Sequence, residues 1–169
     1  MSKRIVLKSV SVVVVLGFVL MFSSCQKEEK KIIGKWEYKK IEVRKLTTSN
    51  LAMNNAIRTM VPTAFPAVMQ TVLGSDFDGI TEFTKKGKVI NGDFTATYKA
   101  NETQLTITTN DGMSVTYDYL VPDDRKLYLD VDIIEMHNEI VDAFLEGMLR
   151  GAGLEITNLV IRLSFAKQK

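Results

Sequence analysis

The chain has one cysteine and one histidine in 169 residues, and both scarcities narrow the chemistry open to it. A single cysteine cannot form an intramolecular disulfide, so the fold has to rest on its hydrophobic core. A single histidine, His137, excludes a metal centre built from several histidine ligands. The sequence also has no internal repeat, no low-complexity stretch and no glycine-rich loop that would cradle a phosphate.

A hydrophobic run long enough to span a bilayer is also missing. The apolar segment Val10–Phe22 covers about 13 residues, against the roughly 20 that a membrane-spanning helix needs. Basic residues precede this segment at positions 3, 4 and 8, and small residues follow it at Ser23 and Ser24. This order of charge, apolar stretch and small residues predicts a secretory signal peptide over residues 1–24.

The residues after the apolar segment resemble two motifs of bacterial lipoproteins. Phe22-Ser23-Ser24-Cys25 resembles a lipobox, with Phe22 where the family usually has leucine. Gln26-Lys27-Glu28-Glu29 resembles the surface-export tag of Bacteroidetes lipoproteins. The resemblance implies lipidation at Cys25, a lipid anchor in the outer membrane and exposure at the cell surface, with the periplasmic face as the alternative. Residues 25–32 would then be the lipidated cysteine and a charged tether; the other interpretation is a plain secreted protein.

The charge balance argues against nucleic acid as a partner. Residues 1–24 hold three of the 22 basic residues and no acidic ones, so their removal changes the net charge from +2 to about −1. No net positive charge remains to attract a phosphate backbone. The remaining chain has the usual length of one domain, which we place at residues 33–169.

From Ile33 onward, apolar and polar residues mostly alternate, which is the pattern of half-buried strands. The parity of this alternation changes after Tyr38, so we expect a bulge near residues 39–40. Turn signals such as Asn91-Gly92 and Asn110-Asp111-Gly112 follow at short intervals. Strands joined so closely pair antiparallel as a meander, because a parallel crossover needs a dozen residues or more. The sequence predicts a mainly β fold that curls into a barrel or half-barrel of about 7–8 strands.

In two stretches the apolar residues have the spacing of a helix instead of the alternation of a strand. Apolar residues recur at intervals of three and four over residues 50–73, and again over residues 133–150. Ser49 or Asn50 is a candidate N-cap of the first helix, and Gly74 is its candidate terminator. Pro62 and Pro66 predict a kink or two short helices there. Both stripes contain methionines, which suits either helices that gate a barrel mouth or helices that simply bury against the sheet.

The segment Ile33-Gly34-Lys35-Trp36-Glu37-Tyr38 resembles the Gly-x-Trp first strand of lipocalin-like domains. The later segments 83–98 and 105–107 are similar to the repeated strand-turn-strand cadence of the same family. Together these motifs resemble those of small lipocalin-like lipoproteins of Bacteroidetes, which also carry a helix after the Trp strand and another near the C-terminal end. The chain departs from true lipocalins in its long Met-rich insertion and its lack of disulfides.

This resemblance implies a barrel interior able to hold a small hydrophobic or amphipathic ligand, without a cofactor. A barrel of about eight strands is wide enough either for one small ligand or for its own side chains. Tyrosine and tryptophan combine an apolar body with a polar tip, which would orient such a ligand. The alternative is an interaction or structural protein with a filled barrel, such as an accessory subunit of an outer-membrane or surface assembly. The candidate interior residues are Trp36, Tyr38, Phe94, Tyr98, Tyr117 and Tyr119.

Candidate catalytic and metal residues are few, and we expect no enzyme. Asp130 and Asp132, or Asp123 and Asp124, could pair as acid and base, yet strand ends and turns are ordinarily acidic. The segment Asp76-Phe77-Asp78-Gly79 is similar to the start of a calcium loop but lacks the remaining ligands. The sequence predicts neither a catalytic residue nor a metal site.

Overall fold

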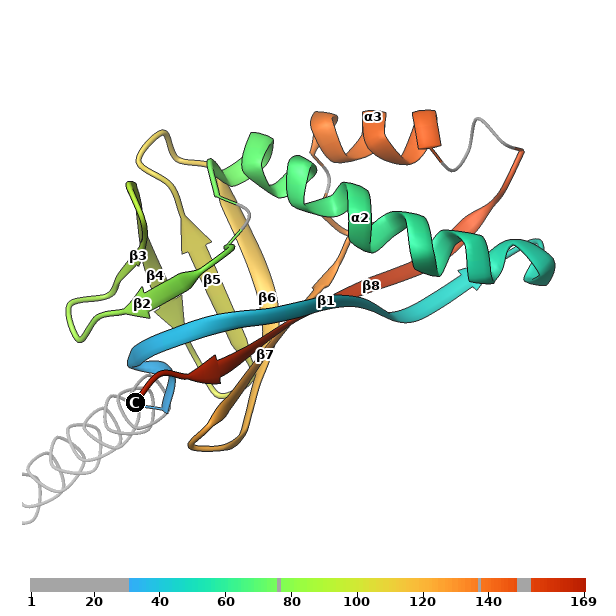
Figure 1. Ribbon diagram of the computed structural model, residues 1–169. Coiled ribbons are helices and arrows are strands. Elements are labelled where there is room, and N and C mark those ends of the chain that lie inside the picture. The colour runs from blue at the N-terminus through green and yellow to red at the C-terminus, as the bar shows by residue number, and fades with distance from the viewer. Residues whose placement is uncertain (1–30, 76, 137, 149–152) are drawn as a thin grey trace, which may run out of the picture.

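The computed structural model describes residues 31–75, 77–136, 138–148 and 153–169, and this part of the chain is mainly β-structure (Figure 1). Eight strands form one closed barrel, with helical segments inserted after the first and the seventh strand. The strands are β1 (Gly34–Thr48), β2 (Ile80–Phe83), β3 (Lys88–Asn91), β4 (Phe94–Ala100), β5 (Gln104–Thr108), β6 (Ser114–Asp123), β7 (Lys126–Asp132) and β8 (Ile156–Lys167).

The barrel is the antiparallel meander that the sequence predicts. Each strand pairs antiparallel with the next one along the chain, and β8 pairs with both β7 and β1, so the sheet is closed. The expected irregularity in β1 is present, because its register with β8 shifts between Tyr38 and Lys40. The inward rows also match the prediction: along β6, Val115, Tyr117 and Tyr119 are buried while the residues between them are exposed.

The turns divide into two sets at opposite ends of the barrel, because successive antiparallel strands run in opposite directions. We name the proximal end as the one that holds the start of β1, the end of β8 and the connections at 84–87, 101–103 and 124–125. The distal end holds the connections at 92–93 and 109–113, together with both helical insertions. The turn at 92–93 has Gly92 at φ 56°, which agrees with the predicted Asn-Gly hairpin.

The first insertion is a short 3-10 turn, η1 (Leu51–Met53), followed by the helix α2 (Asn54–Leu73). Gly74 ends α2 at φ 78°, as predicted. The Asn50 side chain accepts a hydrogen bond from the backbone N–H of Ala52 and so caps η1, whereas Met53 at the start of α2 forms no side-chain cap. Pro62 and Pro66 lie inside one helix rather than between two short ones. Its buried face covers the distal end, where it lies beside the second half of β1 (Figure 1).

The second helix, α3 (Glu139–Met148), starts later than the sequence predicts. The expectation of a helix from residue 133 is wrong for residues 133–136, which continue from β7 as bends and turns. Asn138 provides the start instead, because its side-chain oxygen accepts a hydrogen bond from the backbone N–H of Ile140 at 2.9 Å. Ile133 is nevertheless buried, so the apolar pattern there reflects core packing outside a helix.

A single hydrophobic core runs from the barrel interior to the space beneath the two helices. Inward rows of the strands supply the first part, and residues of α2 and α3 such as Phe65, Met69 and Leu145 supply the second. All barrel strands lie within residues 34–167, so the barrel closes through pairs formed within that part of the chain. The predicted signal peptide and most of the predicted tether lie outside the described residues, as does Cys25.

Candidate functional site

The candidate residues named from the sequence all lie on the inward face of the barrel. Most of them are almost completely buried: Trp36 and Tyr117 are 0% exposed, and Tyr98 and Tyr119 are 6% and 7% exposed. Tyr38 and Phe94 are half-buried and pack against the same core. The prediction that these residues face one interior is therefore confirmed, while their predicted contact with a ligand stays a prediction.

At the proximal end, Trp36 closes the interior. Its indole N–H donates a hydrogen bond to the backbone carbonyl of Ile32 at 2.7 Å. The Lys167 ammonium lies 5.2 Å from the centre of the Trp36 ring, within the range of a cation–π contact. Ile32 is itself fully buried, so the residues just before β1 form part of this closure.

Two tyrosines complete the proximal closure by hydrogen bonding to the hairpin backbone. The Tyr98 hydroxyl donates to the carbonyl oxygen of Thr84 at 2.9 Å, and the Tyr119 hydroxyl donates to that of Asn101 at 2.6 Å. The ring of Phe83 stands edge-on to Tyr98 at 5.3 Å between centroids. These hydroxyls are satisfied by the protein itself and point to the hairpins rather than into an open cup.

At the distal end, the side chain of Phe77 fills the barrel interior. Its ring is fully buried and stands edge-on to both Tyr117 and Phe94, with centroid distances of 6.4 and 6.1 Å. Phe77 has φ 61°, the left-handed region that a bulky residue rarely adopts. Such a conformation costs about 1–3 kcal/mol, so burial of the ring has to offset it.

Asn91 holds the segment that carries Phe77. Its side-chain amide donates to the carbonyl oxygen of Asp78 at 2.8 Å and to the hydroxyl of Thr81 at 3.1 Å. Its side-chain oxygen accepts a hydrogen bond from the Ser75 hydroxyl, which in turn accepts one from the backbone N–H of Phe77 at 3.0 Å. The distal closure thus depends on one polar side chain at the end of β3.

The Tyr117 hydroxyl differs from those of the other interior tyrosines. It is buried in the barrel without a hydrogen-bond partner among the described residues. Burial raises the pKa of the Tyr117 phenol well above its ordinary value. A buried hydroxyl without a partner costs about 1–3 kcal/mol, so this atom is the point in the interior where a polar ligand atom or a water molecule would be stabilised.

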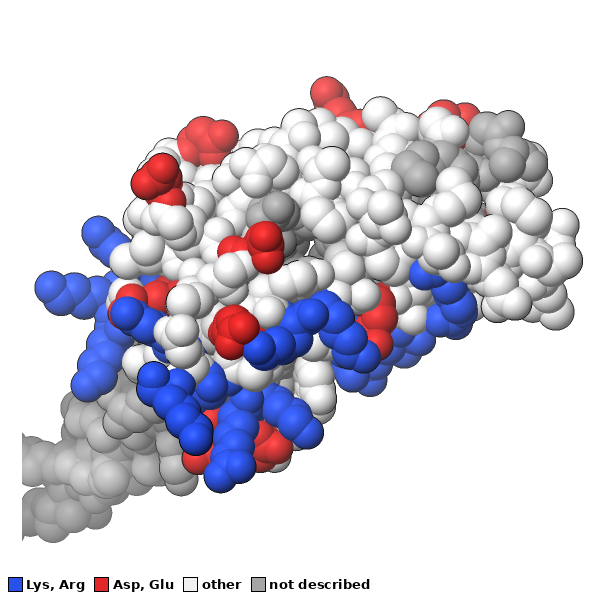
Figure 2. Space-filling model, viewed as in Figure 1, with Lys and Arg blue, Asp and Glu red and all other residues white. Residues whose placement is uncertain are grey.

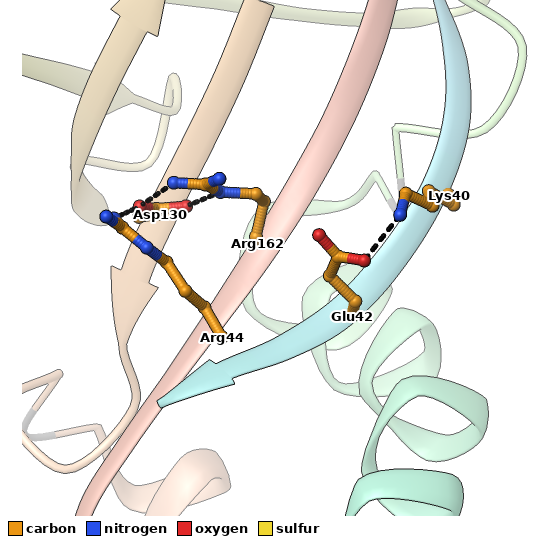
Figure 3. Close-up of polar contacts among 5 residues, drawn as sticks. All are labelled: Lys40, Glu42, Arg44, Asp130 and Arg162. Carbon is orange, nitrogen blue, oxygen red and sulfur yellow. Dashed lines mark hydrogen bonds and ion pairs between the residues drawn. The ribbon is translucent and has the colours of Figure 1, made fainter. Parts of the chain in front are cut away.

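On the outer face of the barrel, Asp130 forms the centre of an ion-pair cluster (Figure 3). The Arg162 guanidinium binds both of its oxygens, with Nε–Oδ1 at 2.6 Å and Nη2–Oδ2 at 2.8 Å, and Arg44 reaches Oδ2 from the other side. The hydrogen bond with Asp130 is the main cause that raises the pKa of Arg162. The same guanidinium lies 4.6 Å from the centre of the Tyr128 ring.

Asp130 is only 6% exposed although it points outward, because the two arginines cover it. Its partners along the sheet are Asp118 on β6 and Arg162 on β8, and Arg162 lies opposite Glu42 on β1. Asp118 and Asp130 form a like-charge pair across β6 and β7, and the positive charges of the two arginines neutralise it. Asp130, which the sequence offers as one half of an acid–base pair with Asp132, is held between two arginines.

Beside this cluster lies an open groove of about 360 Å³ on the outer face of β5, β6 and β7. Its walls are mainly polar and acidic. Glu135 and Met136, from the segment after β7, form part of its lining. The remaining lining residues are Gln104, Ser114, Val115, Thr116, Asp118, Asp130 and Asp132.

Sequence reasoning did not find Phe77, Asn91 or the Asp130 cluster as site features. The residues in question share no short motif; the strands β1, β7 and β8 bring Arg44, Asp130 and Arg162 together from distant parts of the chain. Among the described residues, no group of three or more histidine, cysteine, aspartate or glutamate side chains suited to a metal occurs. Asp76 and His137 lie outside those residues.

No family model matches this chain, and no curated protein or solved structure is significantly similar to it. The fold therefore defines the class, a closed antiparallel barrel with helical insertions, and the lipocalin resemblance stays a prediction. Within residues 31–75, 77–136, 138–148 and 153–169, no helix combines the length and the apolar character that crossing a bilayer requires.

Proposed function

We propose that this chain is a membrane-anchored lipoprotein whose filled barrel is a non-enzymatic interaction module acting through its outer surface. The observation that carries the proposal is the packing of the interior. The rings that would line a ligand cup are buried against one another, and Phe77 occupies the space above Tyr117. The proximal tyrosine hydroxyls bond to hairpin carbonyls, so they serve the closure of the barrel.

The membrane anchor in this proposal rests on Cys25 and the residues around it. A cysteine directly after an apolar segment and two serines suits lipid attachment, and each buried methylene of the lipid adds roughly 0.8 kcal/mol of membrane affinity. We expect the protein in the outer membrane, exposed at the cell surface.

The anchor is tested by cell fractionation of the full chain and its Cys25→Ala variant. Intact-mass measurement should show a lipid-sized increase on the wild-type protein, which should stay with the membranes, and the variant should lack both properties. A Ser24→Ala variant is the matched control and should remain lipidated. Retention of the Cys25→Ala variant in the membrane fraction through a detergent-free wash contradicts the anchor.

The filled interior is tested by asking whether small molecules accompany the protein. Native mass spectrometry and organic extraction of the purified protein should find none in stoichiometric amount. Fatty acids, sterols and haem should leave the fluorescence of Trp36, the single tryptophan, unchanged. A co-purifying small molecule that quenches Trp36 would show that the interior is a ligand site instead.

The outer groove between β5 and β7 is the surface feature on which an interaction module of this kind would rely. An acidic, polar groove suits a basic or polar segment of a protein partner. In native membranes the protein should then migrate in a complex larger than the monomer. Asp118→Lys in the groove should release it, whereas Asp93→Lys, an exposed substitution at the distal turn with the same charge change, should not.

A second function, binding of a small amphipathic ligand inside the barrel, is favoured by one specific observation. The Tyr117 hydroxyl is buried without a partner, and the ring beside it belongs to a residue in a strained backbone conformation. A ligand that displaced Phe77 would relieve that strain and satisfy the hydroxyl. The extraction and fluorescence experiments decide between this function and the filled barrel.

A further inference from the structure

The two ends of the molecule carry opposite charge. In Figure 2 most Lys and Arg side chains gather over the end of the barrel that holds the start of β1, with a few acidic side chains among them and further basic ones along the lower edge, and the opposite, upper side shows only acidic side chains among its charged residues. The exposed basic residues of the proximal end are Lys31, Lys35, Lys85, Lys86, Lys88, Lys99, Arg125, Lys126, Lys167 and Lys169.

Acidic residues at the proximal end are fewer than the basic ones. Glu82 lies 4.0 Å from Lys35, Glu37 lies 2.7 Å from Lys39, and the others are Glu102, Asp123 and Asp124. The distal end and its helices carry an acidic set instead, namely Asp78, Asp93, Asp111, Asp132, Glu135, Glu139, Asp142, Glu146 and Glu155. The small net charge of the whole chain thus hides a strong separation of charge along the molecule.

The proximal end is also where the preceding chain joins the barrel. Trp36 pairs with Lys167, and the backbone N–H of Gln168 donates to the carbonyl oxygen of Lys35 at 2.9 Å, so both ends of the described chain lie there. A fully extended chain covers at most about 3.6 Å per residue, so residues 25–31 span at most about 22 Å. An anchor at Cys25 would therefore keep the proximal end close to the bilayer.

We propose that the proximal end of the barrel docks on a bilayer surface that carries anionic lipid headgroups. Lysine ammonium groups on long flexible stems suit a fluid layer of phosphates, because they need no fixed geometry for each contact. The acidic distal end then points away from the lipid, and repulsion from the same anionic surface reinforces that orientation. The proposal rests on the proposed function only in placing the protein at a membrane.

The test uses a chain of residues 26–169, which retains every strand of the closed barrel, so the lipid anchor plays no part. Co-sedimentation with vesicles of phosphatidylcholine is compared with vesicles that also contain phosphatidylglycerol. Binding should require the anionic lipid and should fall steeply as salt is added, because exposed charges are screened.

The matched variants reverse one exposed charge at different places. Lys86→Glu, in the proximal connection between β2 and β3, should weaken binding to the anionic vesicles about tenfold or more. Lys45→Glu makes the same charge change far along β1, opposite Val160, and should alter binding less than about twofold. Near-ultraviolet circular dichroism of both variants should match the wild-type protein.

Three results would overturn the proposal. These are equal binding to neutral and anionic vesicles, an equal loss of binding in both variants, and binding to a soluble polyanion such as heparin that outcompetes the vesicles. The last result would mean that the basic end recognises a polymer rather than a lipid surface. Failure of lipidation at Cys25 would leave all these measurements unchanged, so the docking and the anchor fail separately.

Discussion

The proximal and distal ends of the barrel are closed in different ways. At the proximal end, aromatic residues of the strands bond to nearby backbone: Trp36 to Ile32, and Tyr98 to the hairpin that follows β2. At the distal end, a separate segment inserts Phe77, and α2 lies over it. The proximal closure is part of the barrel itself, whereas the distal closure is added to it.

This difference indicates which end could change shape. Opening the proximal end would break strand pairs together with buried hydrogen bonds. Opening the distal end would require that the segment around Phe77 leaves its hydrogen bonds to Ser75 and Asn91 and that the Phe77 ring leaves the core, while the strained backbone of Phe77 would be released at the same time. The variants below test this contrast between a fixed and a movable end.

The largest effect is expected at Trp36. Trp36→Ala removes a fully buried ring and its hydrogen bond to Ile32, and should lower the free energy of unfolding by about 4–5 kcal/mol. Urea denaturation followed by circular dichroism measures this loss. Trp36→Phe, which keeps most of the ring, should lose less than half as much; an equally large loss would mean that the hydrogen bond rather than packing closes this end.

A smaller loss is expected at Phe77. Phe77→Ala should cost about 3 kcal/mol or less, at the lower limit for a buried phenylalanine, because the distal segment can partly collapse. The cavity beside Tyr117 should then bind benzene-sized molecules, which calorimetry or xenon-derivatised crystals would reveal. Phe77→Leu serves as the volume control, and a loss in Phe77→Ala as large as that in Trp36→Ala would contradict a movable distal end.

The two interior tyrosines on β6 should respond with opposite signs. Tyr119→Phe removes a hydroxyl that is bonded to the Asn101 carbonyl at 2.6 Å, so unfolding should become easier by about 1 kcal/mol. Equilibrium unfolding in urea measures it. No change, or a gain in stability, would show that the hairpin carbonyl finds another partner and that this bond does not fasten the proximal end.

The smallest effect is a gain at Tyr117. Tyr117→Phe removes a buried hydroxyl without a partner and should stabilise the fold by about 1 kcal/mol. Because burial raises the pKa of this phenol, the unfolded state releases the phenol proton above about pH 10 while the folded state keeps it, so the wild-type protein loses stability as the pH rises beyond that value. The variant should therefore lose less stability than the wild-type protein in alkaline solution. A destabilised variant would indicate that the hydroxyl has a partner in solution.

The strands and their inward rows could be predicted because the signals are local. The alternation along β6 and the Asn91-Gly92 turn depend on neighbouring residues alone, and both are confirmed. Tyr98 and Tyr119 were correctly expected to face the interior, but the carbonyl groups that accept their hydrogen bonds lie 14 and 18 residues away. The alternation of apolar and polar residues along a strand does not specify those hydrogen-bond partners.

The parts that could not be predicted depend on pairing between distant segments. Asp130 meets Arg44 across 86 residues, and Asn91 meets Ser75 across 16. The residues around Phe77 have the composition of a turn, which predicts an exposed segment. Phe77 is buried because it follows α2, which leads the chain back to the barrel. The start of α3 was missed because Ile133 is buried outside a helix, and the polar Asn138 was the better signal.

The long ladder between β1 and β8 has a consequence for how the molecule acquires its shape. β8 joins both β7 and β1, so the last strand to be synthesised is the one that seals the cylinder. Until it arrives, two edges with unsatisfied amides remain open to pairing with other chains. Since contacts between remote segments form slowly, a chain of this topology needs protection from aggregation until β8 is available to pair.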